Sequence, residues 1–476
     1  MEKPKRQGLG AIAAAFARDG TDTQALVENM LRSLSHRGAN SKTLKMTEDG
    51  NVNLSAGYSS GSALEVHVFE ANGAATMLDG SIFRIPDAAR FAHKRLTRKV
   101  SVARAASLLL EEPGAFACAF LQKGKLCAFR DLNGLKPLYY ARSRNLTVFA
   151  SERKALWRVG LSDVRRVNPG YLYSITERRF SETRLAHIPR PAVRNMNIHQ
   201  ASSRLSLLLK RSIRRITHGV DKVAVAFSGG LDSAITALLA NQTRSNVEAV
   251  SVGLPASPEL SAVEHFAREL DLPITLELFS LDSLEEYVRR VVWLIEEPNL
   301  MKVSVAVPLH WAAIVAAKRR CSIMLCGQGS DELYGGYYKY ARTLDKRGRK
   351  ALVAELYRSV VDSAQVNYER DDQATAPFGV ELRTPFADLD VIRFSLSIPS
   401  EFKVRPGNDL TRKWVLRSAA KKMGLPEDMV WRRKKAIQHG TGVENAIRKL
   451  AKKRGLTAEG YLLKVHEEVI RMESMP

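Results

Sequence analysis

The chain has 476 residues, 45% of them hydrophobic, and a formal net charge of +23. A chain of this length is expected to form two or three domains, and no stretch reaches the roughly 18 uninterrupted apolar residues of a membrane span, so an integral membrane protein is excluded. The four cysteines, Cys118, Cys127, Cys321 and Cys326, form no Cys-x-x-Cys pair. Their spacing argues against a zinc site or a disulfide framework, and we expect a cytoplasmic location.

The positive charge is concentrated near the C-terminus, where Lys and Arg outnumber acidic residues sixteen to five between Glu401 and Arg454. Such a field favours polyanions, either nucleotide phosphates or nucleic acid. No RNA-reading motif of interleaved aromatic and basic residues accompanies it. The charge is therefore compatible with nucleic acid as a partner, but no sequence motif supports it.

The first 186 residues are rich in short strands. One amphipathic stretch, Asp22–Ser35, predicts a helix. Four apolar runs separated by turn residues predict strands, namely Phe116–Leu121, Lys125–Arg130, Tyr139–Ala141 and Thr147–Ser151. A segment with two prolines, residues 188–195, is typical of a linker.

Beyond the linker, predicted strands alternate with predicted helices. The strands are Val223–Phe227, Val247–Val252, Ile274–Phe279 and Ile323–Cys326, and the helices are a run from Ala234, Ser261–Leu270, Ser283–Ile295 and Val305–Lys318. This order predicts a parallel, doubly wound α/β sheet whose ligands bind at the carboxyl ends of the strands. The last part, from Ala351, reads as mainly helical and basic.

One strand end carries the sequence Ser228-Gly-Gly-Leu-Asp-Ser. Glycines there allow backbone N–H groups and a helix N-terminus to close on phosphate. No Gly-Lys-Ser/Thr follows, so this is not the familiar nucleoside-triphosphate loop. Asp232 stands inside the anion site, where a carboxylate makes chemical sense as a ligand of Mg²⁺ that also binds phosphate.

A second glycine-rich segment follows Cys326 and reads Gly327-Gln-Gly-Ser-Asp-Glu-Leu-Tyr-Gly-Gly. Its carboxylate, Asp331, is expected to converge with Asp232 on one cleft and to share magnesium bound to a triphosphate. Further on, Arg383 precedes a Pro-Phe turn and is a candidate bidentate clamp for a carboxylate. The cluster Trp431-Arg-Arg-Lys-Lys suits a departing pyrophosphate.

With these blocks in place, the chain resembles the asparagine synthetase family over nearly its whole length. The C-terminal half matches in Ser228–Ser233, Ser251-Val-Gly-Leu-Pro, 327–336, 379–388 and Arg432-Arg-Lys-Lys. The N-terminal half resembles the family's class II glutamine amidotransferase domain in His36-Arg-Gly, Asp79-Gly, Arg130-Asp-Leu-Asn-Gly-Leu-Lys-Pro and Phe149-Ala-Ser-Glu-Arg-Lys.

The resemblance implies an N-terminal α+β sandwich of the Ntn-hydrolase type, residues 1–190, and an ATP pyrophosphatase (PP-loop) domain, residues 198–476. It also implies ATP and Mg²⁺ as cofactors, and attack of a carboxylate on the α-phosphorus to give an acyl-adenylate and pyrophosphate. Ammonia then displaces AMP to form an amide.

The implied roles are transferred residue by residue. Pyrophosphate would be held by Ser228, Gly229, Gly230 and Ser233, and magnesium by Asp232 and Asp331. Val252 and Gly327 would line the adenosine pocket. The acceptor acid would contact Ser330, Glu332 and Arg383, and Lys434 would neutralise the leaving pyrophosphate. The catalytic set would be Asp331, Arg383 and Lys434.

The N-terminal half departs from the family pattern. The family's catalytic cysteine is the processed N-terminal residue and supplies both the thiol and the α-amino base. Gly10 occupies that position here, and Asp79 replaces the oxyanion-binding asparagine. Cys118 and Cys127 lie inside predicted strands and are expected to be small core residues. We therefore expect no glutamine hydrolysis and a structural role for this half.

The second departure is Gln328, where asparagine synthetases carry a glutamate implicated in handling the proton of the attacking amine. Glutamine is not a general base, so Glu332, Glu381 or water takes that duty, or the chemistry differs. β-Lactam synthetases also replace this glutamate and close a ring on the substrate's own nitrogen.

These features favour an AMP-forming amide ligase that uses free ammonia or an amine, with aspartate as the first acceptor to consider. The alternatives are adenylation of another carboxylate, a basic tRNA-associated protein that keeps the nucleotide fold, and a catalytically inactive scaffold. The expected partners are a small carboxylate and ammonia or an amine, with no membrane, and a homodimer is one assembly compatible with the sequence.

Overall fold

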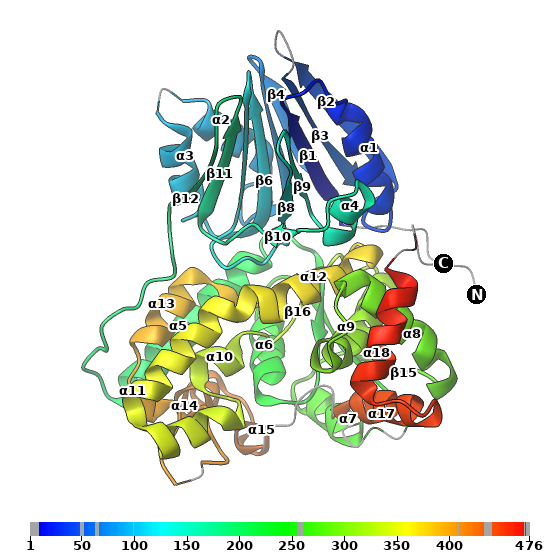
Figure 1. Ribbon diagram of the computed structural model, residues 1–476. Coiled ribbons are helices and arrows are strands. Elements are labelled where there is room, and N and C mark those ends of the chain that lie inside the picture. Colours follow the sequence, from blue (N-terminus) through cyan, green and yellow to red (C-terminus); the bar gives the residue numbers. More distant parts are fainter. Residues whose placement is uncertain are drawn as a thin grey trace.

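The computed structural model describes residues 9–47, 52–61, 66–98, 100–255, 257, 260–432 except 408, 440–470 and 472. Two bodies lie one above the other: a strand-rich one from the N-terminal part of the chain and a helix-rich one from the remainder (Figure 1). Residues 185–197, which have no regular secondary structure, connect them. We propose residues 1–190 and 198–476 as the two domains.

The N-terminal body is a sandwich of two antiparallel six-stranded sheets. The first has the order β10-β8-β9-β1-β3-β2, with β1 (Ala11–Ala17), β2 (Asn40–Thr47), β3 (Asn53–Ser60), β8 (Tyr139–Arg142), β9 (Leu146–Ala150) and β10 (Arg165–Arg166). The second has the order β12-β11-β7-β6-β5-β4, with β4 (His67–Ala71), β5 (Ala74–Ile82), β6 (Gly114–Gln122), β7 (Lys125–Arg130), β11 (Tyr171–Thr176) and β12 (Phe180–Arg184).

Helices cover both outer faces of the sandwich. Apolar residues from the facing sheets form the central core. Helices α1 (Thr23–Ser33) and α4 (Arg153–Arg158) pack on the first sheet, and α2 (Ala88–Leu96) and α3 (Val102–Leu109) pack on the second. The predicted helix is confirmed as α1, whose N-cap, Asp22, accepts hydrogen bonds from the backbone N–H groups of Gln24 and Ala25. The layers are helix, sheet, sheet, helix, which confirms the predicted α+β sandwich.

The C-terminal body is built on a five-stranded parallel sheet of order β15-β14-β13-β16-β17. Its strands are β13 (Lys222–Ala226), β14 (Asn246–Gly253), β15 (Ile274–Leu278), β16 (Ile323–Leu325) and β17 (Glu381–Arg383). The chain builds outward from β13 to β15, then returns to the other side of β13 to add β16 and β17. The order therefore reverses between β13 and β16, where doubly wound sheets bind ligands.

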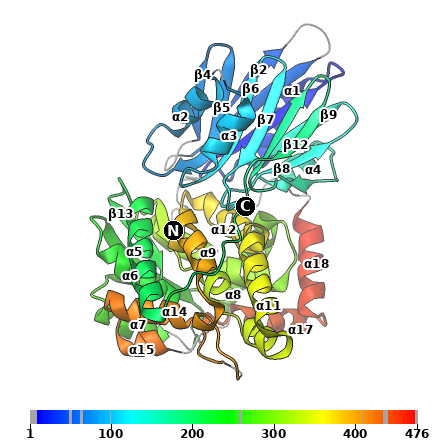
Figure 2. The same cartoon turned by 90° about the vertical axis from the view of Figure 1, so that its left-hand side faces the viewer.

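Helices cover both faces of this sheet, which confirms the doubly wound prediction (Figures 1 and 2). One core is shared with α5 (Ile198–Ile216), α6 (Leu231–Asn241), α7 (Leu260–Glu269), α13 (Leu389–Ser397), α14 (Trp414–Met423) and α15 (Glu427–Trp431). The other is shared with α8 (Leu281–Ile295), α9 (Leu300–Lys318), α17 (Val443–Lys453) and α18 (Ala458–Val469).

Among the described residues, α9 is the one helix whose length and apolar content would suit a membrane span, and 72% of its apolar window is buried inside the protein. It packs in the second core against α8 and α12 (Glu369–Thr375). Buried core helices of soluble proteins share this composition, so α9 is weak evidence for a membrane and is interpreted as a core helix.

The remaining elements lie over the carboxyl edge of the sheet. They are α10 (Ser330–Tyr334), the long α11 (Tyr338–Ser363), a π-helical turn (Ala364–Tyr368) and α12. Helix α12 runs along the junction of the two bodies (Figures 1 and 2). Its side chains therefore face the sandwich on one side and the C-terminal sheet on the other.

Candidate active site

The first part of the site is the turn between β13 and α6. Gly229 has a φ of +65°, which lets the chain turn sharply at the end of the strand. The Ser233 hydroxyl accepts a hydrogen bond from the Ser228 N–H at 3.2 Å and lies 3.1 Å from the Ser228 hydroxyl. Gly230 is the N-cap of α6, an eleven-residue helix. The turn thus presents a helix N-terminus and two hydroxyls, as an anion site requires.

The second part follows β16 and touches the first. A Cβ at Gly327 would lie 2.5 Å from the Asp232 Cβ, so only glycine permits this approach of the two segments. Asp331 lies in the first turn of α10. The adjacent parallel strands thus bring the two predicted magnesium ligands to the same edge of the sheet.

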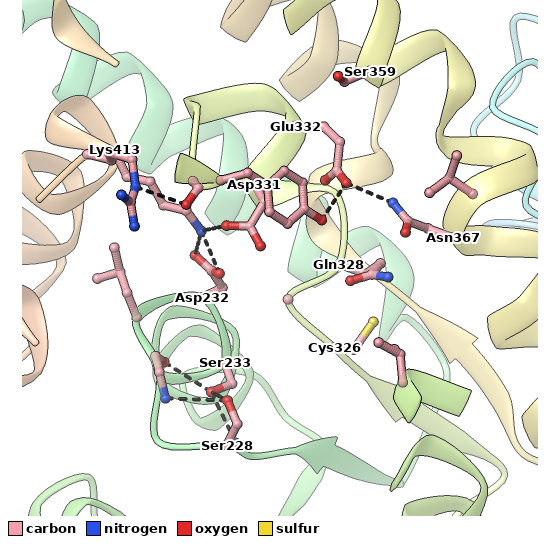
Figure 3. Close-up of a pocket in the computed structure, with 18 of the residues that line it drawn as sticks. Ser228, Asp232, Ser233, Cys326, Gln328, Asp331, Glu332, Ser359, Asn367 and Lys413 are labelled. Atoms are coloured by element: carbon pink, nitrogen blue, oxygen red, sulfur yellow. Dashed lines mark hydrogen bonds and ion pairs between the residues drawn. The ribbon is translucent and has the colours of Figure 1, made fainter. Parts of the chain in front are cut away.

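A lysine that the sequence analysis did not single out joins these two carboxylates. The Lys413 Nζ lies 2.6 Å from Asp232 Oδ2, 2.6 Å from Asp331 Oδ1 and 3.0 Å from the Ser330 hydroxyl. Figure 3 shows Lys413 between the aspartates, above the Ser228–Ser233 turn. Lys413 and Arg412 have φ values of +54° and +51°, a conformation that costs of order 1–3 kcal/mol and is enriched at functional sites.

Three arginines complete the basic wall of the site: Arg412, Arg417 and Arg432. Arg432 Nη1 donates to the Gly229 carbonyl at 2.9 Å, which fixes its guanidinium beside the glycine turn. It belongs to the cluster that was predicted to meet pyrophosphate. The predicted catalytic Lys434 lies outside the described residues, so its role stays a prediction.

All these groups surround a cavity of about 570 Å³, a size typical of small-molecule sites. Of the predicted residues, it is lined by Ser228, Gly230, Asp232, Ser233, Gly327, Asp331 and Glu332. Its far end is lined by apolar side chains of α9 and by polar side chains that follow α11, namely Met301, Val305, Leu309, Asn367, Arg370 and Asp371.

Gln328 and Glu332 lie between the two ends of the cavity. Glu332 Oε1 accepts hydrogen bonds from the Tyr337 hydroxyl and from Asn367 Nδ2, both at 2.8 Å (Figure 3). Burial, reinforced by the neighbouring Asp331, raises the pKa of Glu332. This end of the cavity therefore combines hydrogen-bonding groups with a low-dielectric wall.

Four predicted residues are not among those described as lining the cavity: Gly229, Val252, Ser330 and Arg383. Ser330 is buried behind the aspartates and donates to Asp232 Oδ1 at 2.7 Å. Arg383 donates to the Ile216 carbonyl at 2.6 Å and pairs with Glu381 at 2.9 Å. The predicted clamp role of Arg383 thus has no support from this geometry, because its guanidinium is engaged beside α5 and β17.

In the N-terminal body, Gly10, which the sequence analysis aligned with the family's catalytic cysteine, lies at a tightly packed position. Its φ is +93°, and a Cβ there would lie 2.6 Å from Val66 Cγ2 and 2.8 Å from the Ser59 carbonyl oxygen. The preceding N–H, that of Leu9, donates to the Ala376 carbonyl at 3.1 Å. The backbone at Leu9 and Gly10 therefore packs against the C-terminal body.

The surroundings of Gly10 are filled by buried ion pairs with α12. Arg37 Nη2 lies 2.8 Å from Asp372 Oδ2, and Lys136 Nζ lies 2.9 Å from Asp372 Oδ1. Arg130 Nη2 lies 2.9 Å from Glu369 Oε1. We call these five residues the interface cluster. Arg37 and Lys136 hold the pKa of Asp372 below its usual range despite burial.

Asp79, which the sequence analysis aligned with the family's oxyanion-binding asparagine, is buried beside this cluster. It accepts a hydrogen bond from the Ser151 hydroxyl at 3.2 Å and lies 3.7 Å from Lys136 Nζ. Cys118 and Cys127 are buried in β6 and β7, and burial raises the pKa of both thiols. They are core residues, as predicted.

Comparison with known proteins identifies the family. A family model described as asparagine synthase matches residues 204–353 and 344–466, and one described as a glutamine amidotransferase domain matches residues 97–158. A protein of Methanocaldococcus jannaschii named asparagine synthetase (glutamine-hydrolysing) 1 is 33% identical over 73% of this chain and 73% of its own length. The chain belongs to the asparagine synthase family. This membership places it among the ATP-dependent carbon–nitrogen ligases.

A more distant sequence relative agrees with this assignment. Asparagine synthetase (glutamine-hydrolysing) 3 of Arabidopsis thaliana is 28% identical over 70% of this chain and 59% of its own length. Among solved structures, a glutamine phosphoribosylpyrophosphate amidotransferase from B. subtilis aligns with a TM-score of 0.32 at 16% identity, covering 56% of this chain and 65% of its own. A structural likeness at that level carries no argument about function.

Proposed function

We propose that the protein activates a small carboxylic acid with Mg-ATP and joins it to ammonia or an amine, releasing pyrophosphate and AMP. The observation that carries this proposal is the convergence of Asp232 and Asp331 on one cation, Lys413, beside the glycine turn of Ser228–Ser233. Carboxylates that converge beside an anion site suit a metal-bound polyphosphate.

The residues present fit magnesium, because Asp232 and Asp331 offer the hard oxygen ligands that Mg²⁺ prefers and point to a common position. When bound, the ion neutralises charge on the phosphates and orients them. The N-terminus of α6 and the basic wall, which includes Arg432, would bind the β- and γ-phosphates, which leave together as pyrophosphate.

Two features of the N-terminal body support ammonia or an amine as the nitrogen source. A cysteine at Gly10 would collide with Val66 and Ser59, and the interface cluster fills the neighbouring volume with charged pairs. We therefore propose that ammonia or an amine, and not glutamine, supplies the nitrogen, and that this body packs against the cleft as a structural domain. Four free cysteines, all buried, fit a cytoplasmic location.

For the acceptor carboxylic acid, we propose a chemical class. The cavity beyond the phosphate side combines Asn367, Arg370 and Glu332 with an apolar wall, which suits an amino acid or similar small polar acid. Aspartate is the acceptor to test first, since the family model describes asparagine synthase. Gln328 keeps open the related reaction in which the substrate's own amine closes a ring.

The test is pyrophosphate release from Mg-ATP with L-aspartate, L-glutamate, succinate or β-alanine, with ammonium or glutamine as the nitrogen source and mass spectrometry of the products. We expect AMP, pyrophosphate and an amide with ammonium and at least one acid, and no amide from glutamine alone. No pyrophosphate release with any of these acids would contradict the proposal. An amide made from glutamine alone would contradict the assigned nitrogen source.

A further inference from the structure

The cavity contains a buried carboxylate to which the sequence analysis gave no role. Asp371 lies on α12, is 2% exposed and lines the same cavity as Asp232 and Gln328. Its neighbours on the helix, Glu369 and Asp372, bind cations of the N-terminal body. Asp371 is therefore the acidic residue of this helix that faces the cleft.

The backbone before α12 accounts for the orientation of Asp371 toward the cavity. Residues 364–368 form a π-helical turn, which shifts the side chains that follow relative to those of α11. Turns of this kind occur frequently at functional sites. The shift places Asn367, Arg370 and Asp371 on the cavity wall while Glu369 and Asp372 remain on the opposite side.

One oxygen of Asp371 is held by Arg370, and the other lacks a hydrogen-bond partner among the described residues. Oδ1 accepts a hydrogen bond from Arg370 Nε at 2.7 Å and lies 2.6 Å from Arg370 Nη2. Oδ2 is buried without a hydrogen-bond partner among the described residues. Buried carboxylate oxygens are rarely left unpartnered in folded proteins. An unpartnered one in a substrate-sized cavity indicates a substrate group that donates a hydrogen bond.

The charged environment suits a group that accepts a proton. The side-chain amide of Gln328 faces the Asp371 carboxylate. Burial raises the pKa of Asp371, and this effect exceeds the lowering by Arg370 and Gln328. The other titratable groups that face it are Glu332, Cys326 and Tyr368. A carboxylate with a raised pKa is a stronger base than an ordinary aspartate.

Glu332 is the competing carboxylate in the cavity. Its Oε1 already accepts two hydrogen bonds, from Tyr337 and Asn367, and it directly follows Asp331, a proposed magnesium ligand. Asp371 has a buried oxygen without a hydrogen-bond partner among the described residues, and it lies beside Gln328, the position at which the family's proton-handling glutamate is missing. Geometry therefore favours Asp371.

We propose that Asp371, oriented by Arg370 and assisted by Gln328, is the general base that accepts the proton of the attacking amine. The inference rests on the proposed ligase function and adds a catalytic residue to it. The nitrogen lone pair forms the C–N bond with the acyl-adenylate carbonyl carbon, and the nitrogen loses one proton to Asp371 Oδ2. The C–O bond to AMP breaks, its electron pair leaves on the phosphate oxygen, and Asp371 later returns the proton to water.

The test separates the two half-reactions in the full-length chain, with the acid from the panel above that gives wild-type turnover. For Asp371→Asn we expect ATP–pyrophosphate exchange within about threefold of wild type and amide formation lower by about 10²–10⁴-fold, the usual worth of a general base. In wild type the amide-forming rate should rise with pH through the raised pKa of Asp371, and this rise should vanish in the variant.

Three further variants distinguish a base from a structural carboxylate. Adding Gln328→Glu to Asp371→Asn should recover about tenfold or more of amide formation, because it restores a base beside the same position. Asp372→Asn, on the same helix but facing the other way, should leave the ratio of the two half-reactions unchanged in folded protein. Glu332→Gln should not reproduce the selective loss.

Equal loss of both half-reactions in Asp371→Asn, or no loss, would overturn the inference. A selective loss in Glu332→Gln in place of Asp371→Asn would do the same. If wild type releases no pyrophosphate with any acid, the proposed function fails and the inference falls with it. If wild type turns over and Asp371→Asn behaves like it, the inference alone fails.

Discussion

The molecule contains two buried groups of charges that differ in how completely they are matched. In the interface cluster, each cation faces a carboxylate of α12 within 3 Å and the side chains fill the space between the two bodies. In the cleft, the partly buried Asp232 and Asp331 share a single lysine beside a cavity of about 570 Å³, and Asp371 has one oxygen without a hydrogen-bond partner among the described residues. We interpret the matched charges of the interface cluster as stabilising the contact between the two bodies. We interpret the charges around the cavity as groups that bind a ligand.

The largest effect on pyrophosphate release is expected in the cleft, from Asp232→Asn. The substitution keeps the shape and removes the charge, so pyrophosphate release should fall by about 10²–10³-fold, as for other preorganised charge-stabilising groups. A pyrophosphate assay together with thermal unfolding checks this. Asp221→Asn, at an exposed position just before β13, is the matched control and should leave pyrophosphate release unchanged. Retained turnover in Asp232→Asn would show that the two loops do not bind Mg-ATP as proposed.

Lys413→Met tests whether the cleft is built around a cation. Without Lys413, two partly buried aspartates repel each other, so the metal-free protein should lose about 1–3 kcal/mol of stability. Added Mg²⁺ should raise the Tm of the variant more than that of wild type, because the ion takes over the neutralisation. Lys421→Met, at an exposed position, provides the control. Equal Mg²⁺ shifts in both proteins would show that Lys413 and the metal do not share a site.

Arg37→Met tests the interface cluster. The side chain is fully buried between Glu152 and Asp372. Its loss leaves Asp372 with Lys136 and Glu152 with Lys154 and His36, so buried negative charge is less compensated, at a cost of about 3–5 kcal/mol. Denaturant unfolding measures the loss, and pyrophosphate release per folded molecule should be unchanged. The exposed pair of Arg165 and Asp163 offers the control Arg165→Met, worth about 0–1 kcal/mol. A normal stability for Arg37→Met would remove the distinction between the two groups of charges.

The smallest effect concerns pH and His36, which lies beside the cluster, 3.0 Å from Glu152. Burial lowers the pKa of His36 to about 4, below the roughly 6.5 of an unfolded histidine. The unfolded chain then binds the proton first, so the stability that neutral His36 contributes is complete above about pH 6.5 and is lost as pH falls toward 4. Unfolding midpoints should show this slope, His36→Gln should reduce it, and His187→Gln, at an exposed position, should not. An unchanged slope in His36→Gln would assign it to other groups.

Much of the fold could be predicted from the sequence because it depends on residues that lie close together in the chain. The alternation of strands and helices and the glycines of Ser228–Ser233 and 327–336 predict the parallel sheet, and the structure places the two loops at adjacent strand ends. The sequence therefore places Asp232 and Asp331 at one edge of the sheet without knowledge of any contact, and both line the same cavity.

Lys413 and Asp371 could not be found in this way. Lys413 contacts Asp232 across 181 positions of sequence, and it lies in a basic region where no spacing distinguishes it. Asp371 is one of three acidic residues on a single short helix that follows a π-helical turn, and the sequence does not indicate which of the three lines the cavity. Arg383 shows the reverse case, since an arginine before a Pro-Phe turn has a local signature but its guanidinium binds the Ile216 carbonyl.

The distance in sequence between Arg37 and Asp372, 335 positions, also sets the order in which the protein assembles during synthesis. The sandwich domain is complete on the ribosome before α12 exists, and at about 5–20 residues per second the remaining chain needs roughly 10–40 s to reach it. During that interval Arg37, Arg130 and Lys136 are hydrated cations on an open surface. Docking of α12 is therefore a late folding event, at which these cations lose their water together.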